Sequence, residues 1–309
     1  MRRVLISSIF ILGMTLSLFA EKPREYKVTA PPEGKYDEFY KKYVSAQGFP
    51  IVASEKVSDY ALLEAAYLID IMLDGRDDIR KAIIDSGTRF AIMSEDELTT
   101  NIPEHSDLKP KIFWDRRARG LGATRRRPAV SCGEENLLCY PGDPYNQENI
   151  LVHEFAHVIH QMGMNNIDKQ FQSKLKATFD AAMKEGLWKD KYAASNPAEY
   201  WAEGVQSWFN NNRKPDHDHN HVDTRQELKE YDPRLAKLIE SVFGPREWTY
   251  VRPAERKLAP HMSGYDPNQA PTFAWPKDLQ KQYEDYLNKT ENPPAPTDKA
   301  SIKSKKNQE

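Results

Sequence analysis

Two histidines and a glutamate lie close together in the segment His153-Glu154-Phe155-Ala156-His157. In a helix, residues four apart project from the same face at about 40° to each other, so both imidazoles can reach one metal ion. Glu154 directly follows the first histidine, where its carboxylate can accept a proton from a metal-activated water. The spacing is typical of hydrolytic zinc sites. It predicts His153 and His157 as metal ligands and Glu154 as the general base.

A zinc hydrolase needs a third protein ligand and an open position for water. A third histidine ten residues after the first is excluded here, because that position is Gly163. A glutamate from a later helix is the other arrangement, and Glu199 and Glu203 lie four residues apart among aromatic side chains. We expect Glu199 to bind the metal and Glu203 to orient a ligating histidine. The alternative for Glu199 is a purely structural role in a capping box that begins at Asn196.

The two motifs and their separation resemble the catalytic region of the anthrax lethal factor and MtfA-like zinc metallopeptidases, which are of the gluzincin type. The resemblance runs from near Asn149 to Phe209 and includes the segment from Tyr192 to Glu203. It implies a single bound Zn²⁺ and a zincin-like catalytic domain. Residue by residue, it implies that zinc is bound by His153, His157 and Glu199, that Glu154 is the base, and that Tyr192 stabilises the transition state.

The first residues read as a secretory leader. Met1-Arg2-Arg3 precedes an apolar stretch that ends at Ala20, before a polar segment. We expect a signal peptide over residues 1–20 and a secreted, periplasmic or extracellular mature protein without stable membrane insertion. An uncleaved membrane anchor is the alternative. Cys132 and Cys139 are the two cysteines of the chain, and in an exported protein they are expected to form a disulfide. A thiolate metal site is the competing idea.

The composition of this 309-residue chain is that of a globular protein, with 39% hydrophobic residues and a formal net charge of −2. This near balance gives no general basic field and argues against a nucleic-acid partner. One local run is strongly basic and either contacts an acidic substrate or partner or is a solvated loop. It consists of Arg116, Arg117, Arg119, Arg125, Arg126 and Arg127.

Apolar periodicity predicts a mainly helical α+β fold with a small sheet. Helices are expected over 36–43, 59–73, 79–85, 147–162, 168–188, 196–211 and from Pro233, and strands over Arg89–Met93 and Lys111–Trp114. The second strand is a candidate edge strand for binding an extended substrate. We expect a catalytic domain over 21–255, with its metal-site core at about 149–209. A Pro- and Lys-rich extension over 256–309 is expected to be largely disordered from about residue 291.

Other histidines lie near the motif or in a later loop. His160 shares the metal-facing side of the helix and is expected to be a core or supporting residue. His217, His219 and His221 alternate with polar residues, so their loop either binds a second metal, lines the mouth of the cleft, or is simply solvated.

The sequence therefore predicts a secreted zinc metallopeptidase that acts on a protein or peptide substrate. Two other interpretations of the sequence stay open. One is a zinc amidase that acts on cell-wall or other non-protein substrates, and the other is a secreted zinc-binding protein without turnover.

Overall fold

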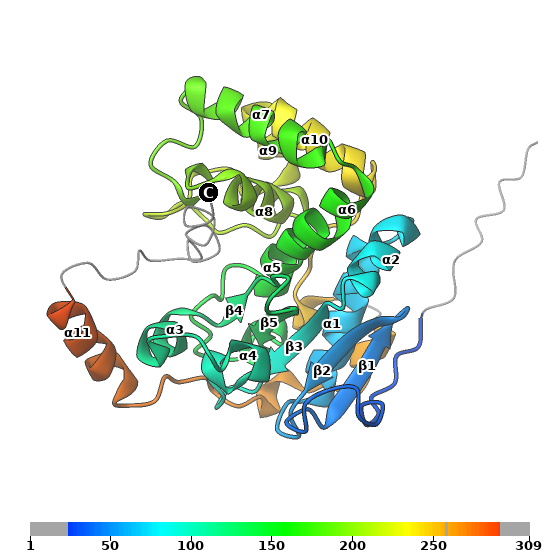
Figure 1. Ribbon diagram of the computed structural model, residues 1–309, viewed down its shortest axis with the longest axis vertical. Coiled ribbons are helices and arrows are strands. Elements are labelled where there is room, and N and C mark those ends of the chain that lie inside the picture. The colour runs from blue at the N-terminus through cyan, green and yellow to red at the C-terminus, as the bar shows by residue number, and fades with distance from the viewer. Residues whose placement is uncertain (1–23, 257–258, 291–309) are drawn as a thin grey trace, which may run out of the picture.

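Five strands form one mixed sheet in the computed structural model, which describes residues 24–256 and 259–290 (Figure 1). They are β1 (Lys42–Ala46), β2 (Phe49–Ala53), β3 (Arg89–Met93), β4 (Gly120–Leu121) and β5 (Ala129–Gly133). The sheet order is β1-β2-β3-β5-β4. β2, β3 and β5 run parallel, and the outer strands β1 and β4 are antiparallel to their neighbours. The short strand β4 therefore forms the edge of the sheet next to β5.

Helices pack on the sheet and form a second layer beyond the central helix α5 (Figure 1). Around the sheet lie α1 (Asp59–Met72), α2 (Asp77–Asp85), α3 (Lys111–Arg117) and α4 (Glu134–Leu137). The chain then continues through α5 (Ile150–Val158), the π-helical turn Ile159–Met164, α6 (Asn165–Ile167), α7 (Phe171–Lys184), α8 (Pro197–Trp208), α9 (Arg225–Tyr231) and α10 (Pro233–Phe243). The α+β class expected from the sequence is confirmed by this arrangement.

The helix that carries the His-Glu-x-x-His motif is α5, and it begins three residues later than the periodicity predicts. Its N-cap is Asn149, whose side chain accepts a hydrogen bond from the backbone N–H of Val152. This contact satisfies one of the free N–H groups of the first turn and sets where the helix starts. α5 contacts β4 and β5 on one side and α8 on the other. The motif is therefore held between the sheet and the second helical layer.

The predicted start of α8 is confirmed. Asn196 is its N-cap and accepts hydrogen bonds from the backbone N–H groups of Ala198 and Glu199, and Pro197 occupies the first turn. α10 crosses α8 closely at Gly204, because a Cβ atom there would lie 2.6 Å from Leu235 Cδ2. The glycine thus lets α10 pack directly on the back of the helix that carries the predicted third ligand.

Two of the predicted elements are wrong. Residues 36–41 form turns instead of a helix, and residues 42–43 are already the start of β1. The aromatic rings of this segment cover one face of the sheet, where Tyr40 is buried against Val52 and Ala91. Residues Lys111–Trp114, predicted as a strand, form the first part of α3, which begins directly after Pro110. The edge strand next to α5 is β4, which follows α3 after a two-residue connection.

The predicted disulfide is also wrong, since Cys132 and Cys139 are free thiols. Cys132 lies in β5 and is completely buried. Cys139 lies beyond α4, with its Sγ 3.9 Å from both the Asn136 carbonyl and the Tyr250 hydroxyl. The intervening helix gives the two side chains different partners. Burial raises the pKa of both thiols, so they are held in the protonated form.

The segment after α10 returns to the sheet side of the molecule. It includes the 3₁₀ turns Pro253–Glu255, Pro260–Met262 and Pro267–Gln269 and the helix α11 (Leu279–Lys289), which packs on α3. Other 3₁₀ turns are Thr99–Asn101, Pro103–His105 and Tyr192–Ala194. The predicted signal peptide and the predicted disordered tail lie outside the described residues. Among the described residues, no helix combines the length and hydrophobicity needed to cross a bilayer.

Candidate metal centre

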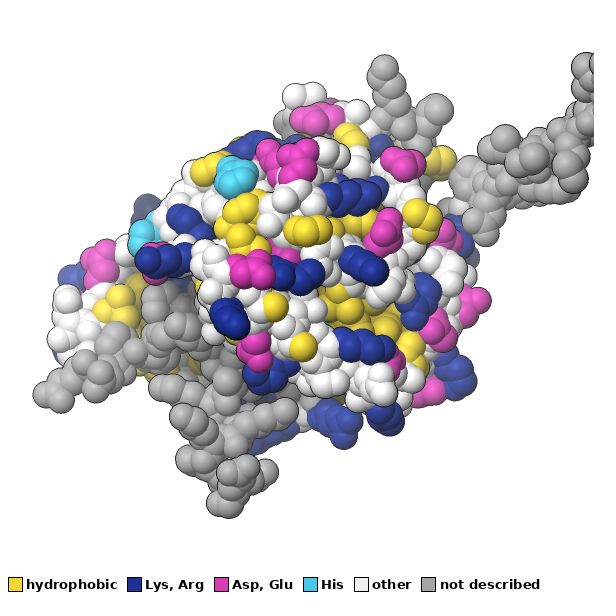
Figure 2. All heavy atoms as spheres, turned by 90° about the horizontal axis from the view of Figure 1, so that it is seen from above, with side chains coloured by type: hydrophobic (Ala, Val, Ile, Leu, Met, Phe, Trp, Pro, Cys, Tyr) yellow, Lys and Arg dark blue, Asp and Glu magenta, His cyan; other side chains and the backbone are white. Residues whose placement is uncertain are grey.

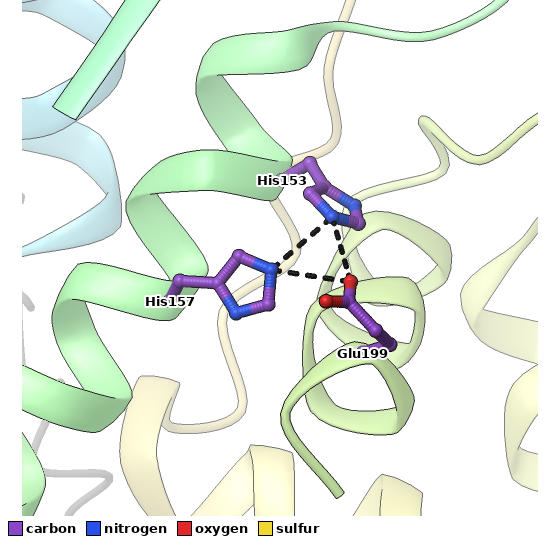
Figure 3. A group of neighbouring side chains, drawn as sticks. All are labelled: His153, His157 and Glu199. Atoms are coloured by element: carbon purple, nitrogen blue, oxygen red, sulfur yellow. Dashed lines mark hydrogen bonds and ion pairs between the residues drawn. The ribbon is translucent and has the colours of Figure 1, made fainter. Parts of the chain in front are cut away.

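Three side chains from two neighbouring helices converge on one point. His153 and His157 project from α5, and Glu199 projects toward them from the first turn of α8 (Figure 3). Their Nε2, Nε2 and Oε2 atoms lie 3.3 Å apart along each side of the triangle that they form. All three residues are buried. The structure therefore brings together the three residues that the sequence predicts as ligands.

The size of this triangle fits a small tetrahedral cation. Zinc binds nitrogen and carboxylate oxygen at about 2.0–2.1 Å, which places two ligands of a tetrahedron about 3.3 Å apart. Glu199 Oε2 has no hydrogen-bond partner with acceptable geometry among the described residues, although it is buried between the two imidazoles. A buried carboxylate oxygen without a donor is costly unless a cation balances it. The donor set, two imidazoles and one carboxylate, is one that zinc accepts.

The electrostatics of the site also favour a bound cation. Burial on its own would lower the pKa of His153, but the carboxylates of Glu199, Glu154 and Glu203 outweigh it and raise that pKa well above its ordinary value. Burial would raise the pKa of Glu199, yet the two imidazoles hold it well below its usual range. The cluster therefore retains positive charge in the form of a proton when no metal is bound, and a divalent cation would displace that proton.

His153 is oriented by a chain of two further side chains. Its Nδ1 lies 2.7 Å from Gln206 Oε1, and the Gln206 amide nitrogen donates to Glu148 Oε2 at 2.9 Å. Because the amide nitrogen faces Glu148, its oxygen faces His153 and accepts the Nδ1 hydrogen. In the neutral ring, after the extra proton has left the cluster, the remaining hydrogen is therefore on Nδ1, and Nε2 is unprotonated and aimed at the metal position. Neither Gln206 nor Glu148 is predicted by the sequence, although Gln206 lies on the same face of α8 as Glu199.

Glu203, predicted to orient a ligating histidine, lies near His153 but has closer partners. Its Oε1 is 3.6 Å from His153 Nδ1, whereas its Oε2 accepts from Asn212 Nδ2 at 3.1 Å and lies 3.5 Å from His219 Nε2. Asp216 contacts the other ring nitrogen of His219 at 2.9 Å. Burial would lower the pKa of His219, but Glu203 and Asp216 raise it to about 9. Glu203 therefore lies between two imidazoles, His153 and a charged His219.

The histidines outside the motif have different surroundings. His219 lines the cavity beside the metal centre, whereas the His217 side chain is 96% exposed. His221 is exposed and its ring packs edge-on against Tyr231. These three residues form no second metal cluster among the described residues. His160 is buried between Phe171 and Trp201, with its Nε2 bonded to Gln172, as expected of a core residue.

A cavity of about 490 Å³ opens beside the three converging side chains. Glu154 and Tyr192 both line it, and the Tyr192 ring stacks on the His153 ring at a centroid distance of 6.2 Å. On the sheet side, Gly120 of the edge strand β4 forms part of the wall. A Cβ atom on Gly122 would lie 3.3 Å from Glu154 Oε2, so the chain after β4 passes directly over this carboxylate. The predicted base and the predicted oxyanion donor thus face the same space as the metal centre.

Comparisons with known proteins add little to this geometry. No family model matches the chain. No curated protein matches it either. Among solved structures, the chain is similar to the PRO-PRO endopeptidase PPEP-2 from Paenibacillus alvei, with 17% sequence identity and a TM-score of 0.35, over 64% of this chain and 98% of that chain.

Proposed function

We propose that this protein is a zinc-dependent metallopeptidase of the gluzincin type, with a zincin-like catalytic domain. The observation that carries the proposal is the triangle of His153, His157 and Glu199, whose ligand atoms are spaced as a tetrahedral zinc site requires. The position of Glu154 beside it supports turnover, because a purely structural zinc site needs no carboxylate facing an open cavity.

The chain supplies the other groups that peptide hydrolysis needs. A zinc ion held by the three ligands would lower the pKa of water toward about 7 and polarise the scissile carbonyl. Glu154 accepts a proton from the attacking water and passes it to the leaving amine. Tyr192, across the cavity, donates a hydrogen bond to the carbonyl oxygen as negative charge develops there. Gln206 and Glu148 keep His153 in the tautomer that binds metal.

The edge strand β4 supports a peptide as the substrate. It borders the cavity and is paired on one side with β5. An extended peptide can add to the open edge of a sheet through main-chain hydrogen bonds, whatever its side chains. We therefore place the substrate along β4, with its scissile bond next to Glu154.

The leader sequence supports export, so the substrate is proposed to be extracellular or periplasmic. Basic and acidic side chains are interspersed on the molecular face shown in Figure 2. The proposal that the substrate is not a nucleic acid is supported by the small formal net charge of −2, which gives no general positive field.

The first experiment measures zinc by elemental analysis in the mature protein and in variants. We expect one zinc per chain, weakened binding in Glu199→Ala, and none in a variant lacking both His153 and His157. His217→Ala is the matched control, because the His217 side chain is exposed and its hydrogen-bond partner is Asp218, not one of the three proposed ligands. Absence of zinc in the reconstituted wild type would refute the proposal.

The second experiment tests turnover on casein, purified cell wall and small amides. Glu154→Gln is expected to keep its zinc and lose about 10²–10⁴-fold in activity, which is the usual contribution of a general base. Hydrolysis of cell wall but not of casein would replace the peptidase by an amidase. A zinc-loaded protein that hydrolyses none of the three would be a binding protein.

A further inference from the structure

The arginines of the basic run between residues 116 and 127 have different surroundings in the structure. Some are paired, one is exposed, and some line the cavity. Arg119 is completely buried in an ion pair with Glu135 at 2.6 Å. Arg127 and Arg126 lie 2.8 and 3.7 Å from Asp107. Arg116 donates to Gln280 and lies over the Trp275 ring, and Arg125 is exposed. The remaining arginine of the run is Arg117.

Arg117 is the last residue of α3 and lines the cavity together with Glu154. Its guanidinium lies 5.9 Å from the centre of the Phe113 ring, and its carbonyl accepts a hydrogen bond from the Tyr145 hydroxyl at 2.7 Å. Among the described residues, no carboxylate lies within ion-pair distance of this guanidinium. Its backbone is thus fixed while its charge is unbalanced.

The other cations of the cavity wall have partners within the protein. Lys191 Nζ donates to the carbonyls of Asp216 and His217, at 3.0 and 3.1 Å. Arg213 forms an ion pair with the Asp216 carboxylate at 2.6 Å. These contacts hold the loop that carries His219. Of the cavity-lining cations that the structure describes, Arg117 is therefore the one available to a ligand.

We propose that Arg117 binds a carboxylate group of the substrate and makes the enzyme selective for acidic peptides. This inference rests on the proposed peptidase function. A guanidinium can form two parallel hydrogen bonds to a carboxylate, and the adjacent aromatic ring reduces its competing hydration. Because α3 leads through Ala118 and Arg119 directly into β4, a peptide paired with β4 passes the end of α3.

The carboxylate has two possible sources, an Asp or Glu side chain and the free C-terminus of the peptide. The test uses internally quenched peptides in which each position near the cleaved bond is in turn Glu, Gln or Lys, made with free and with amidated C-termini. Values of kcat/KM are compared for wild type, Arg117→Gln, Arg117→Lys and Arg117→Glu. Arg116→Glu is the matched control, since this neighbour lies on the same helix but contacts Trp275 and Gln280 instead of the cavity.

In the wild type, we expect Glu at one position to raise kcat/KM at least about tenfold over Gln, which corresponds to 1.4 kcal/mol. Arg117→Gln should abolish this preference, Arg117→Lys should keep part of it, and Arg117→Glu should favour Lys at the same position. Arg116→Glu should retain the wild-type preference. A dependence on the free C-terminus instead of an internal Glu would assign the carboxylate to the chain end.

Two results would overturn the inference. One is a wild-type enzyme that cleaves the Glu, Gln and Lys peptides equally, and the other is an acidic preference that survives in Arg117→Gln. Either result leaves the peptidase function intact, because peptides are still cleaved. If the zinc-loaded wild type cleaves none of the peptides, the proposed function itself fails, and the role of Arg117 fails with it.

Discussion

Tyr192, the proposed oxyanion donor, is positioned by neighbouring residues. Its ring stacks on His153 and faces the cavity from a short 3₁₀ turn, which is tied to the His219 loop by a hydrogen bond from Tyr192 N–H to the Asp218 carbonyl at 2.8 Å. The hydroxyl is thus carried by a fixed backbone. This is the preorganisation that transition-state stabilisation requires.

We predict that Tyr192→Phe keeps its zinc and its fold but loses about 100-fold in kcat, because one oxyanion donor is removed while the ring remains. The value of kcat is measured with an internally quenched peptide, and the zinc content by elemental analysis. Wild-type kcat in this variant would remove Tyr192 from the mechanism without affecting the metal site.

The orientation of His153 gives a second prediction at this scale. Gln206→Leu should weaken zinc binding about 10- to 100-fold, because loss of the Nδ1 acceptor allows the tautomer in which Nε2 carries the proton. Competition with a chelator measures the affinity. Gln172→Leu is a matched control, since Gln172 makes the same kind of contact at 2.7 Å with His160, which is not a ligand. Equal zinc affinity in both variants would contradict this role of Gln206.

At the scale of elements, β4 must lie close to α5 if substrate is to meet the metal centre. The sequence around it is Gly120-Leu121-Gly122, and both glycines face α5. A Cβ atom on Gly120 would lie 2.3 Å from Ile150 Cγ2 and 2.9 Å from the Ser131 carbonyl oxygen. On Gly122, its closest neighbour would be Glu154 Oε2 at 3.3 Å. The two positions therefore differ in what a methyl group would disturb.

We predict that Gly120→Ala lowers the free energy of unfolding by about 1–3 kcal/mol, because a backbone atom and a core side chain must move. Gly122→Ala should leave stability nearly unchanged and lower kcat, because it displaces the base. Urea unfolding and peptide assays on the two variants test the contrast. The idea fails if Gly120→Ala is as stable as Gly122→Ala, or if Gly122→Ala has full activity.

Elements with local signals could be predicted from the sequence. The N-cap Asn196 followed by Pro197 marks the start of α8, and the spacing of Thr224 and Glu227 is that of the capping box which the structure shows at the start of α9. Lys111–Trp114 could not be assigned in this way, because a short apolar run has no period that separates strand from helix. Its aromatic residues are explained only by α11, which packs Tyr283 and Tyr286 around Phe113.

The residues of the candidate metal centre also differ in whether the sequence alone predicts them. The two histidines are fixed by helical spacing alone, so the sequence is sufficient for them. Gln206 and Glu148 have no motif, because their roles depend on how α8 and the loop before α5 meet in space. Arg117 could be singled out only after the fold had accounted for the other arginines of its run.

At the scale of the whole molecule, buried neutral histidines make stability depend on pH. His105 is 1% exposed, its Nε2 lies 3.0 Å from Ser131 Oγ in β5, and burial lowers its pKa from 6.5 to about 4. The unfolded chain therefore binds a proton at this residue between pH 6.5 and 4 that the folded chain does not. The contribution is fully present above pH 6.5 and is lost as the pH falls toward 4.

For His105 alone, this difference amounts to about 2 kcal/mol between pH 7 and pH 5. We predict that the change in the wild-type free energy of unfolding between pH 7 and pH 5, measured with urea, contains this fall as one of several contributions. In His105→Gln the fall should be smaller by about 2 kcal/mol, even if the variant is less stable at pH 7 through loss of packing. His217→Gln removes an exposed histidine and should show the wild-type fall. A His105→Gln variant with an undiminished fall would mean that other groups cause the acid sensitivity, and His160, whose pKa burial also lowers to about 4, would be the next to test.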